Sequence, residues 1–167
     1  DILLLQETSN NWSVQPRSKS LQARAEPELN PMETRIRCSH NIHDVTGSRH
    51  QWGGTAILTH GTLSGYPMGA DLDRARMGRW TWARYRGQGG TTLRCVSIYR
   101  PCDTEAETKL LSVAAQQRAR LQAINDDRYP RTAFIEDLDN EISEWLEEGD
   151  NLIIGGDMNE DIFGEKV

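Results

Sequence analysis

The stretch NLIIGGDMNED, residues 151–161, decides how the rest of the chain is interpreted. Its first four residues are typical of a buried strand. Gly155 and Gly156 come next, and glycine allows the backbone to turn sharply and leaves room for a ligand. Asp157 and Asn159 follow, two residues apart. The pattern therefore predicts a buried strand that anchors an acid and an amide at its tip.

The acid and the amide allow two interpretations. Side chains two apart in an extended chain point to the same side. Asp157 would then accept a proton from an attacking water, while the amide of Asn159 holds that water or a phosphate oxygen. Asp and Asn after two glycines are also ordinary turn residues, and the spacing alone favours this second interpretation.

A second apolar run, DILLL at residues 1–5, predicts a central strand that is buried on both faces. Glu7 follows this strand closely. A carboxylate beside a buried strand is costly unless something pairs with it. Magnesium is one such partner, because it takes oxygen ligands and usually only one or two carboxylates. Glu7 is therefore a candidate ligand for a divalent metal.

The remaining sequence predicts several strands followed by two helices. Residues 9–32 are polar and predict a loop with one short helix. Strands are expected at residues 34–40, 55–60, 78–86 and 91–101, the last two joined by a hairpin turn at GQGG. Helices are expected at residues 104–124, capped by Thr104 and Glu107, and at 133–148, ended by Gly149. The expected apolar face of the second helix consists of Ile135, Leu138, Ile142, Trp145 and Leu146. This order predicts an α/β (α+β) chain with helices packed on a largely antiparallel sheet.

Composition bounds the class of protein. The chain has 167 residues, 37% hydrophobic and 26% charged, which is typical of one soluble globular domain. No apolar run is long enough to cross a bilayer, so no membrane partner is expected. The net charge of −6 argues against a broadly basic nucleic-acid surface, although seven arginines gather at residues 74–100. Each of them alone is best explained as part of a solvated face.

The cysteines and histidines suggest an intracellular protein and one alternative site. The three cysteines include no Cys-x-x-Cys pair, so we expect free thiols in a reducing compartment, nuclear or cytoplasmic in a eukaryote. A zinc site is the alternative, and its candidate ligands are Cys38, His40, His43 and His50. Exposed loop histidines are the default interpretation of this cluster.

The tryptophans divide into two groups. Trp80 and Trp82 lie two apart on an expected strand, so both are expected in the core rather than stacked on bases. Trp12 and Trp52 lie in expected loops and are better candidates for exposed contacts with a substrate.

Four motifs in this order, LQET, GGTAIL, VSIYRP and IIGGDMNED, resemble the endonuclease/exonuclease/phosphatase superfamily. Exonuclease III-like repair nucleases and pancreatic-type DNases share its fold. The resemblance covers residues 1 to about 162 and implies a partial four-layer α/β sandwich with mostly antiparallel sheets and flanking helices. It implies that Glu7 binds the metal, Tyr99 lies near the scissile phosphate, Asp157 activates water, and Asn159 orients the water and the phosphate. Arg100 lies beside these positions, and we expect it, with Trp52, to contact substrate.

The sequence departs from the family pattern at both ends. The family has an Asn on a strand before the Glu strand and a late Asp-His pair, and neither can be placed here. The histidines, of which His60 is the last, lie too early to supply the missing one. We therefore expect residues 1–167 to be a single incomplete domain, cut from a longer protein and inactive alone. We also expect the isolated chain to be marginally stable, because incomplete sheets expose strand edges.

The resemblance implies a Mg²⁺- or Mn²⁺-dependent phosphodiesterase. The motifs YRP and GDMNED are similar to those of endonuclease domains of non-LTR retrotransposons, so the favoured hypothesis is a monomeric DNA endonuclease or nickase. One alternative is a phosphatase or lipid phosphodiesterase of the same fold, because fold does not decide substrate. Another is an inactive segment that only binds nucleic acid or a partner.

Overall fold

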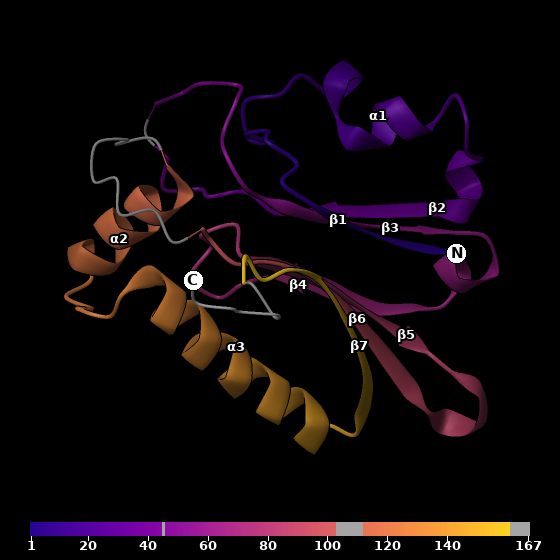
Figure 1. The fold of residues 1–167 in the computed structure, drawn as a ribbon. Helices are drawn as coiled ribbons and strands as arrows, with labels where there is room; N and C mark the ends of the chain where they lie inside the picture. Colours follow the sequence, from indigo (N-terminus) through magenta and orange to yellow (C-terminus); the bar gives the residue numbers. More distant parts are fainter. Residues whose placement is uncertain (45, 103–111, 161–167) are drawn as a thin grey trace, which may run out of the picture.

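The structure, a computed structural model, describes residues 1–44, 46–102 and 112–160. Within these residues the strands form two sheets that stack face to face (Figure 1). The first sheet has the order β1 (Ile2–Gln6), β3 (Thr55–His60), β2 (Thr34–Cys38), and both pairings are antiparallel. The second has the order β4 (Pro67–Leu72), β5 (Trp80–Arg86), β6 (Thr92–Tyr99), β7 (Asp150–Asp157). Its pairings are antiparallel except that of β6 with β7, which is parallel.

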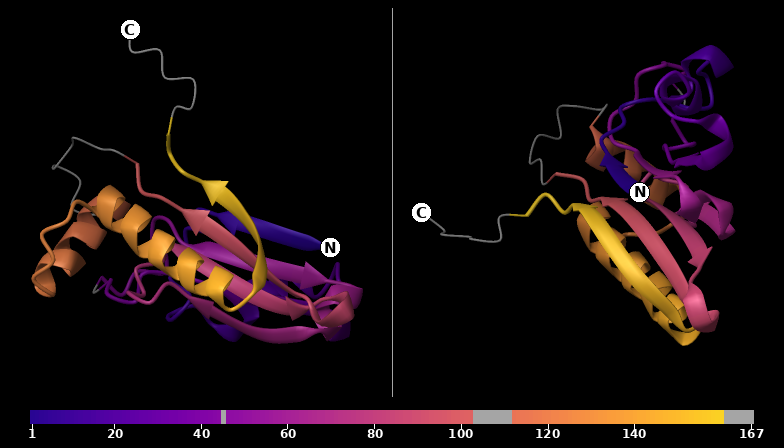
Figure 2. Two further views of the ribbon diagram at one scale, coloured as in Figure 1. Left: turned by 90° about the horizontal axis from the view of Figure 1, so that it is seen from below. Right: turned by 90° about the vertical axis from the view of Figure 1, so that its right-hand side faces the viewer.

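Helices cover the outer faces of the two sheets. The short helix α1 (Leu21–Ala25) lies over the three-stranded sheet, and α3 (Pro130–Glu147) runs along the four-stranded sheet, with α2 (Val113–Ala123) beside it (Figures 1 and 2). Single turns of 3-10 helix, η1 to η4, occur at Arg17–Lys19, Pro31–Glu33, Thr62–Gly65 and Gln88–Gly90. The mixed α/β fold expected from the sequence is confirmed. Among the described residues, no helix has both the length and the apolarity needed to cross a membrane.

The alternation of β5 explains why the four-stranded sheet lies in the middle. Trp80 packs on Phe134 of α3, edge to face with ring centroids 5.5 Å apart. Thr81, one residue on, points the other way, and its hydroxyl lies 2.8 Å from the hydroxyl of Thr55 on β3. Residues that face opposite sides with a period of two therefore bury this sheet on both faces. The core against α3 consists of Trp80, Val96, Ile98, Phe134, Leu138 and Trp145.

Helix α3 begins three residues earlier than expected, at Pro130. Proline suits the first helical position, where its missing N–H is not needed. Gly149, with φ of 79°, ends the helix as predicted. The apolar face was placed wrongly in part, because Ile135 and Leu146 are 40% and 57% exposed whereas Phe134 is fully buried.

The other elements differ from expectation in smaller ways. Helix α2 begins after Ser112, whose hydroxyl accepts a hydrogen bond from the N–H of Ala115 at 3.2 Å. The predicted cap at Thr104 and Glu107 lies outside the described residues. Strand β4 was not predicted, because Pro67 and Gly69 interrupt its pattern; the structure accommodates them with a bulge at the edge of the sheet.

The two predicted apolar strands, β1, expected to be central and buried on both faces, and β7, expected to be buried, lie at the ends of the two strand orders. Within the described residues each pairs with one strand. As a result Leu3 is 49% exposed, and Ile153 and Ile154 are 49% and 39% exposed. The two strands contact each other across the sheets, on the same side of the sandwich.

Gly155 and Gly156 do not make the turn that the sequence predicted. Both lie inside β7, which continues to Asp157. A Cβ on Gly156 would overlap the carbonyl oxygen of Ile98 on β6, and a Cβ on Gly155 would lie 2.8 Å from Cδ1 of Leu4. The glycines therefore allow β7 to approach β6 and β1 closely, and the chain turns only after the strand ends.

Six of the seven central arginines form ion pairs with acids. Arg79, with 1% of its surface exposed, lies 2.7 Å from Asp137, and Arg94, 3% exposed, lies 2.7 Å from Asp150. Further pairs join Arg74 to Glu144, Arg76 to Asp71 and Arg84 to Asp150. The expected solvated faces are thus replaced, at Arg79 and Arg94, by buried ion pairs.

Candidate active site

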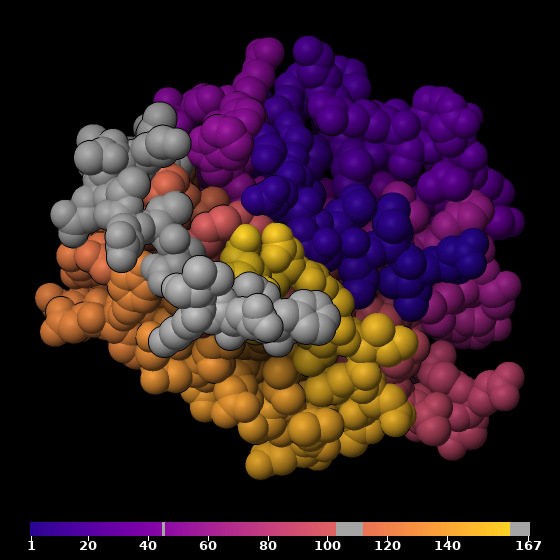
Figure 3. Space-filling model, in the orientation of Figure 1, coloured from indigo at the N-terminus to yellow at the C-terminus, as the bar shows by residue number. Residues whose placement is uncertain are grey.

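The structure brings the ends of β1, β6 and β7 together at one edge of the sandwich. Tyr99 and Asp157 are register partners at the carboxyl ends of the parallel strands β6 and β7. From the other sheet, β1 delivers Glu7, and the hydroxyl of Tyr99 donates a hydrogen bond of 2.6 Å to Oε1 of Glu7. The yellow end of β7 lies beside the indigo N-terminal residues on this face of the molecule (Figure 3).

Two further hydrogen bonds join β1 to β6 just before Glu7. The amide of Gln6 donates to the hydroxyl of Ser97 at 3.1 Å, and this hydroxyl donates to the carbonyl oxygen of Leu5 at 2.9 Å. Ser97 therefore uses both its donor and an acceptor position across the sheet interface. These bonds fix the position of the end of β1 along β6, and so the position of Glu7 beside Tyr99.

Two residues at the strand ends have a left-handed backbone. Glu7 has φ of 49° and Asn159 has φ of 47°. This conformation costs roughly 1–2 kcal/mol for most residues, and asparagine tolerates it better than glutamate. The next residue, Thr8, holds the conformation of Glu7 by donating its N–H to the carbonyl oxygen of Gly54 at 3.2 Å. Strained residues of this kind cluster at functional sites.

Asp157 and Asn159 form a turn. The N–H of Asn159 donates to Oδ1 of Asp157 at 2.8 Å, so the extended conformation assumed for a same-side pair does not continue. The turn nevertheless fixes the amide side chain of Asn159: its Nδ2 donates to the carbonyl oxygen of Arg100 at 2.6 Å, and its Oδ1 accepts from Sγ of Cys102 at 3.0 Å. The acid and the amide are thus held beside the end of β6.

The surroundings of Tyr99 keep its phenol protonated. Burial raises the pKa of Tyr99, and the hydrogen bond to the Glu7 carboxylate raises it further. Gly53, with φ of 80°, lies against the ring, where an added Cβ would be 3.4 Å from Cε1. The phenol is therefore fixed as a donor to Glu7.

The two residues predicted to contact substrate, Arg100 and Trp52, differ in how far their side chains are already engaged by partners within the protein. Arg100 forms an ion pair with Glu160, and hydrogen bonds from Arg100 and Arg131 hold the pKa of Glu160 below its usual range. Trp52 is 56% exposed, stacks edge to face with His50 at 4.6 Å, and is the neighbour in sequence of Gly53. Trp52 is thus exposed next to Gly53, which lies against the ring of Tyr99, whereas the guanidinium of Arg100 is paired with Glu160.

Sequence reasoning missed two residues of this site. Cys102 donates to Asn159, and Arg131 contacts the segments that follow both β6 and β7. The only local signal for Arg131 is its place directly after Pro130 at the start of a helix. Its partners are distant in sequence, so no spacing rule could have found them.

A divalent metal fits the donors of this site. The side chain of Glu7 is exposed, and the hydroxyl of Tyr99 occupies one of its two oxygens. Among the described residues, no three His, Cys, Asp or Glu side chains are grouped so as to hold a metal. The alternative zinc cluster is therefore not assembled there; Nε2 of His43, for example, contacts the carbonyl oxygen of Ala75 at 2.9 Å. Glu7 alone suits a hard divalent cation that takes few carboxylates and completes its shell with water and phosphate.

A family model described as the endonuclease/exonuclease/phosphatase family matches residues 1–163. Its members are generally hydrolytic enzymes that depend on a divalent metal. No curated protein matches the chain. The family match spans β1 to β7, and with them every side chain that meets at the edge of the sandwich.

Proposed function

Because the chain belongs to the endonuclease/exonuclease/phosphatase family, whose members are metal-dependent nucleases, phosphodiesterases and phosphatases, we propose that it is the catalytic part of a DNA endonuclease. The observation that supports this most directly is the 2.6 Å hydrogen bond from Tyr99 to Glu7, beside the ends of β6 and β7. It joins a carboxylate from one sheet to the tips of two strands in the other.

Each residue has a role that follows from its surroundings. Glu7 would hold Mg²⁺ or Mn²⁺, with its carboxylate oriented by the hydroxyl of Tyr99. When bound, the cation supplies positive charge next to the phosphate oxygens. Asp157 accepts the proton of the attacking water. Asn159 contributes an NH₂ group with two hydrogens, of which the contact with Arg100 uses one, so the other is suited to a phosphate oxygen.

Trp52 supports nucleic acid as the substrate. Its ring is exposed and its sequence neighbour Gly53 lies against Tyr99, and aromatic rings bind single-stranded or unstacked bases by stacking, irrespective of sequence. The motifs YRP and GDMNED are similar to those of endonuclease domains in non-LTR retrotransposons. This similarity favours DNA as the substrate and a mobile element as the source of the protein. The substrate would be held by a few contacts near the site, since six of the seven central arginines are paired with acids.

The second candidate is a phosphatase or a lipid phosphodiesterase of the same fold. The pairing of Arg100 with Glu160 favours it, because a broad phosphate backbone would gain from a free guanidinium at this position. A small phosphate ester needs fewer cationic contacts, so the acidic surface would be less of a disadvantage.

Plasmid nicking tests the proposal. The full-length protein that contains this chain is incubated with supercoiled DNA and Mg²⁺, and nicked circles are expected. Asp157→Asn and Glu7→Gln should abolish them while leaving the melting temperature within a few degrees, and EDTA should abolish them in the wild type. Absence of nicking together with hydrolysis of a phosphoinositide or of a small phosphate ester would reject DNA as the substrate.

A further inference from the structure

Arg131, in the first turn of α3, is an arginine with only 7% of its surface exposed. Arginine is almost never buried without partners. Its NH1 donates to the carbonyl oxygen of Pro101 at 2.7 Å, just after β6. Its NH2 donates to the carbonyl oxygen of Asn159 at 3.1 Å and to Oε1 of Glu160 at 2.6 Å, just after β7. One guanidinium group therefore contacts both segments, the one that follows β6 and the one that follows β7.

The geometry requires arginine. The planar guanidinium presents separate N–H groups in a rigid fork, so NH1 and NH2 can serve two segments at once. A lysine ammonium is a single point of charge and could not reach both with the same geometry. Glu160 balances the buried charge, and the same oxygen, Oε1, also pairs with Arg100.

This contact acts on a residue with a left-handed backbone. Asn159 has a left-handed backbone, and its side chain is held at Nδ2 by Arg100 and at Oδ1 by Cys102. The bond from Arg131 to its carbonyl oxygen adds a third restraint, from a helix rather than from a loop. Sites whose groups are held by rigid elements keep the geometry that catalysis needs.

We propose that Arg131 is a positioning residue that holds Asn159 in place for the reaction. The proposal rests on the proposed function, in which Asn159 orients the water and the phosphate. Arg131 has no contact with Glu7, which would hold the metal, so loss of the guanidinium fork lowers kcat far more than it raises KM.

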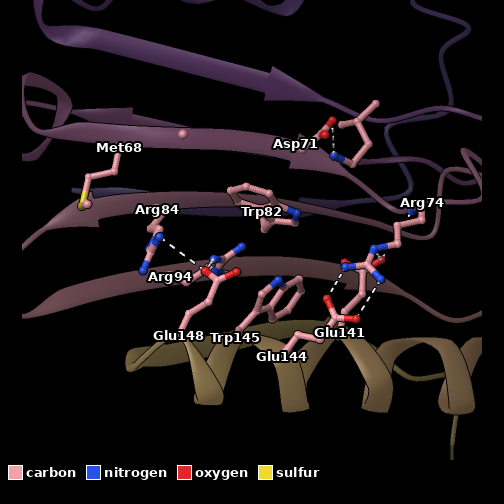
Figure 4. A pocket seen from close by; sticks show the side chains of 12 residues that line it. Met68, Asp71, Arg74, Trp82, Arg84, Arg94, Glu141, Glu144, Trp145 and Glu148 are labelled. Atoms are coloured by element: carbon pink, nitrogen blue, oxygen red, sulfur yellow. Dashed lines mark hydrogen bonds and ion pairs between the residues drawn. The ribbon is translucent and has the colours of Figure 1, made fainter.

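Arg94 provides a matched control at the opposite end of the same strands. It is 3% exposed, and it donates to Asp150 at 2.7 Å and to Glu148 at 2.8 Å. Its guanidinium lies against the rings of Trp82 and Trp145, 4.2 Å and 4.8 Å from their centroids (Figure 4). Like Arg131 it ties α3 and β7 together, but it does so where β6 begins rather than where it ends.

The first test compares kinetics of four variants of the full-length protein: Arg131→Met, Arg131→Lys, Arg94→Met and Arg94→Lys. Cleavage of a defined DNA is measured with Mg²⁺, per folded molecule, alongside melting temperatures. A displaced catalytic group costs about 10- to 100-fold in rate, so both Arg131 variants should lose at least about tenfold in kcat with KM within about threefold. The Arg94 variants should lose stability but keep kcat within about threefold. If Arg131→Met does not fold, the kcat of Arg131→Lys alone tests the proposal.

Equal kcat in the Arg131 and Arg94 variants would overturn the proposal, as would an effect confined to KM. The second test does not need activity. The side-chain amide signals of Asn159 are assigned in an NMR spectrum with the help of Asn159→Ala, and they should shift in Arg131→Lys but not in Arg94→Lys. If the wild type cleaves no phosphate ester, the proposed function fails, and the Asn159 signals alone decide: no shift in Arg131→Lys refutes the positioning role.

Discussion

At the scale of the residue, Tyr99 and Glu7 form the contact on which the site depends. A phenol is already protonated in the neutral pH range, and burial raises the pKa of Tyr99 further, so its hydroxyl donates to the carboxylate there. A hydrogen bond to a metal-binding carboxylate orients it and tunes its affinity. Its removal should therefore change metal dependence more than it changes the fold.

Tyr99→Phe is expected to lower kcat/KM about 10- to 100-fold and to raise the Mg²⁺ concentration needed for half-maximal activity. The ring remains to pack against Gly53, so the melting temperature should stay close to that of the wild type. Titration of activity with Mg²⁺ measures the effect. A variant with wild-type metal dependence would show that the hydroxyl does not act on Glu7.

Gly156→Ala is expected to lower the free energy of unfolding by about 3 kcal/mol or more, because the added methyl overlaps backbone atoms of Ile98 that cannot move away. Gly65→Ala is the control: no heavy atom lies within 4 Å of its added Cβ. The control should change stability by less than about 0.5 kcal/mol. Urea unfolding compares the two, and equal free energies of unfolding would contradict the packing role of Gly156.

The glycines also show what a local pattern can predict. Apolar runs followed by Glu7 and Asp157 predicted the strand ends, because burial and strand length are local properties. The glycines were interpreted as a turn, since the neighbours that exclude a side chain, Leu4 and Ile98, are distant in sequence. The candidate residues Glu7, Tyr99, Asp157 and Asn159 were predicted from a resemblance of motifs, whereas the contacts of Arg131 and Cys102 became visible only in the fold.

At the scale of the element, Asp150 joins β7 to the neighbouring strands β5 and β6. It is 5% exposed and lies at the start of β7, where Arg84, Arg94 and Thr92 donate to it at 2.6–2.7 Å. Burial alone would raise the pKa of Asp150, but these hydrogen bonds outweigh burial and lower it. Its folded pKa therefore lies below its unfolded pKa, so its contribution to stability is present above the unfolded pKa and is lost as the pH falls through the folded value.

Asp150→Asn should lower the free energy of unfolding by about 3 kcal/mol at pH 7, because it leaves buried arginine charge without its partner. The difference from the wild type should shrink as the pH falls below about 4, where the unfolded carboxyl group becomes protonated. Denaturant unfolding of both proteins between pH 3 and 7 measures this. A difference that stays constant over this range would show that ionisation of Asp150 does not contribute.

The elements themselves were predictable to different degrees. Helical spacing predicted α3, yet the buried face was misplaced because Ile135 and Leu146 satisfy the period on its exposed side. Strand β4 escaped prediction because Pro67 and Gly69 are poor strand formers that an edge position tolerates. Local propensity is weakest where a partner element supplies the pairing.

At the scale of the whole molecule, the side of the sandwich formed by β1 and β7 is apolar and open among the described residues. Leu3, Ile153 and Ile154 are each more than a third exposed there. Strand edges of this kind pair readily with other chains. The isolated chain should therefore associate as its concentration rises, in line with the marginal stability predicted from the sequence.

Ile154→Lys should reduce this association, since a charge on an edge strand opposes pairing. Sedimentation of the 167-residue chain at several concentrations measures it. Ile135→Lys, on the exposed side of α3, is the control and should leave association unchanged. A wild-type chain that is monomeric at all concentrations and melts cooperatively at high temperature would contradict both expectations.

Because β6 and β7 are parallel, α3 has to return the chain to the start of β7, and this constrains the length of the helix. The 18 residues of α3 span about 27 Å and the 8 residues of β7 about 26 Å, so the helix returns the chain over the same length that the strand then covers. That equality places the first turn of the helix level with the last residues of the strand. One added helical turn would leave the strand register unchanged and carry Arg131 about 5 Å beyond Asn159. Natural variants with a longer α3 should therefore support this asparagine from a different position in the chain.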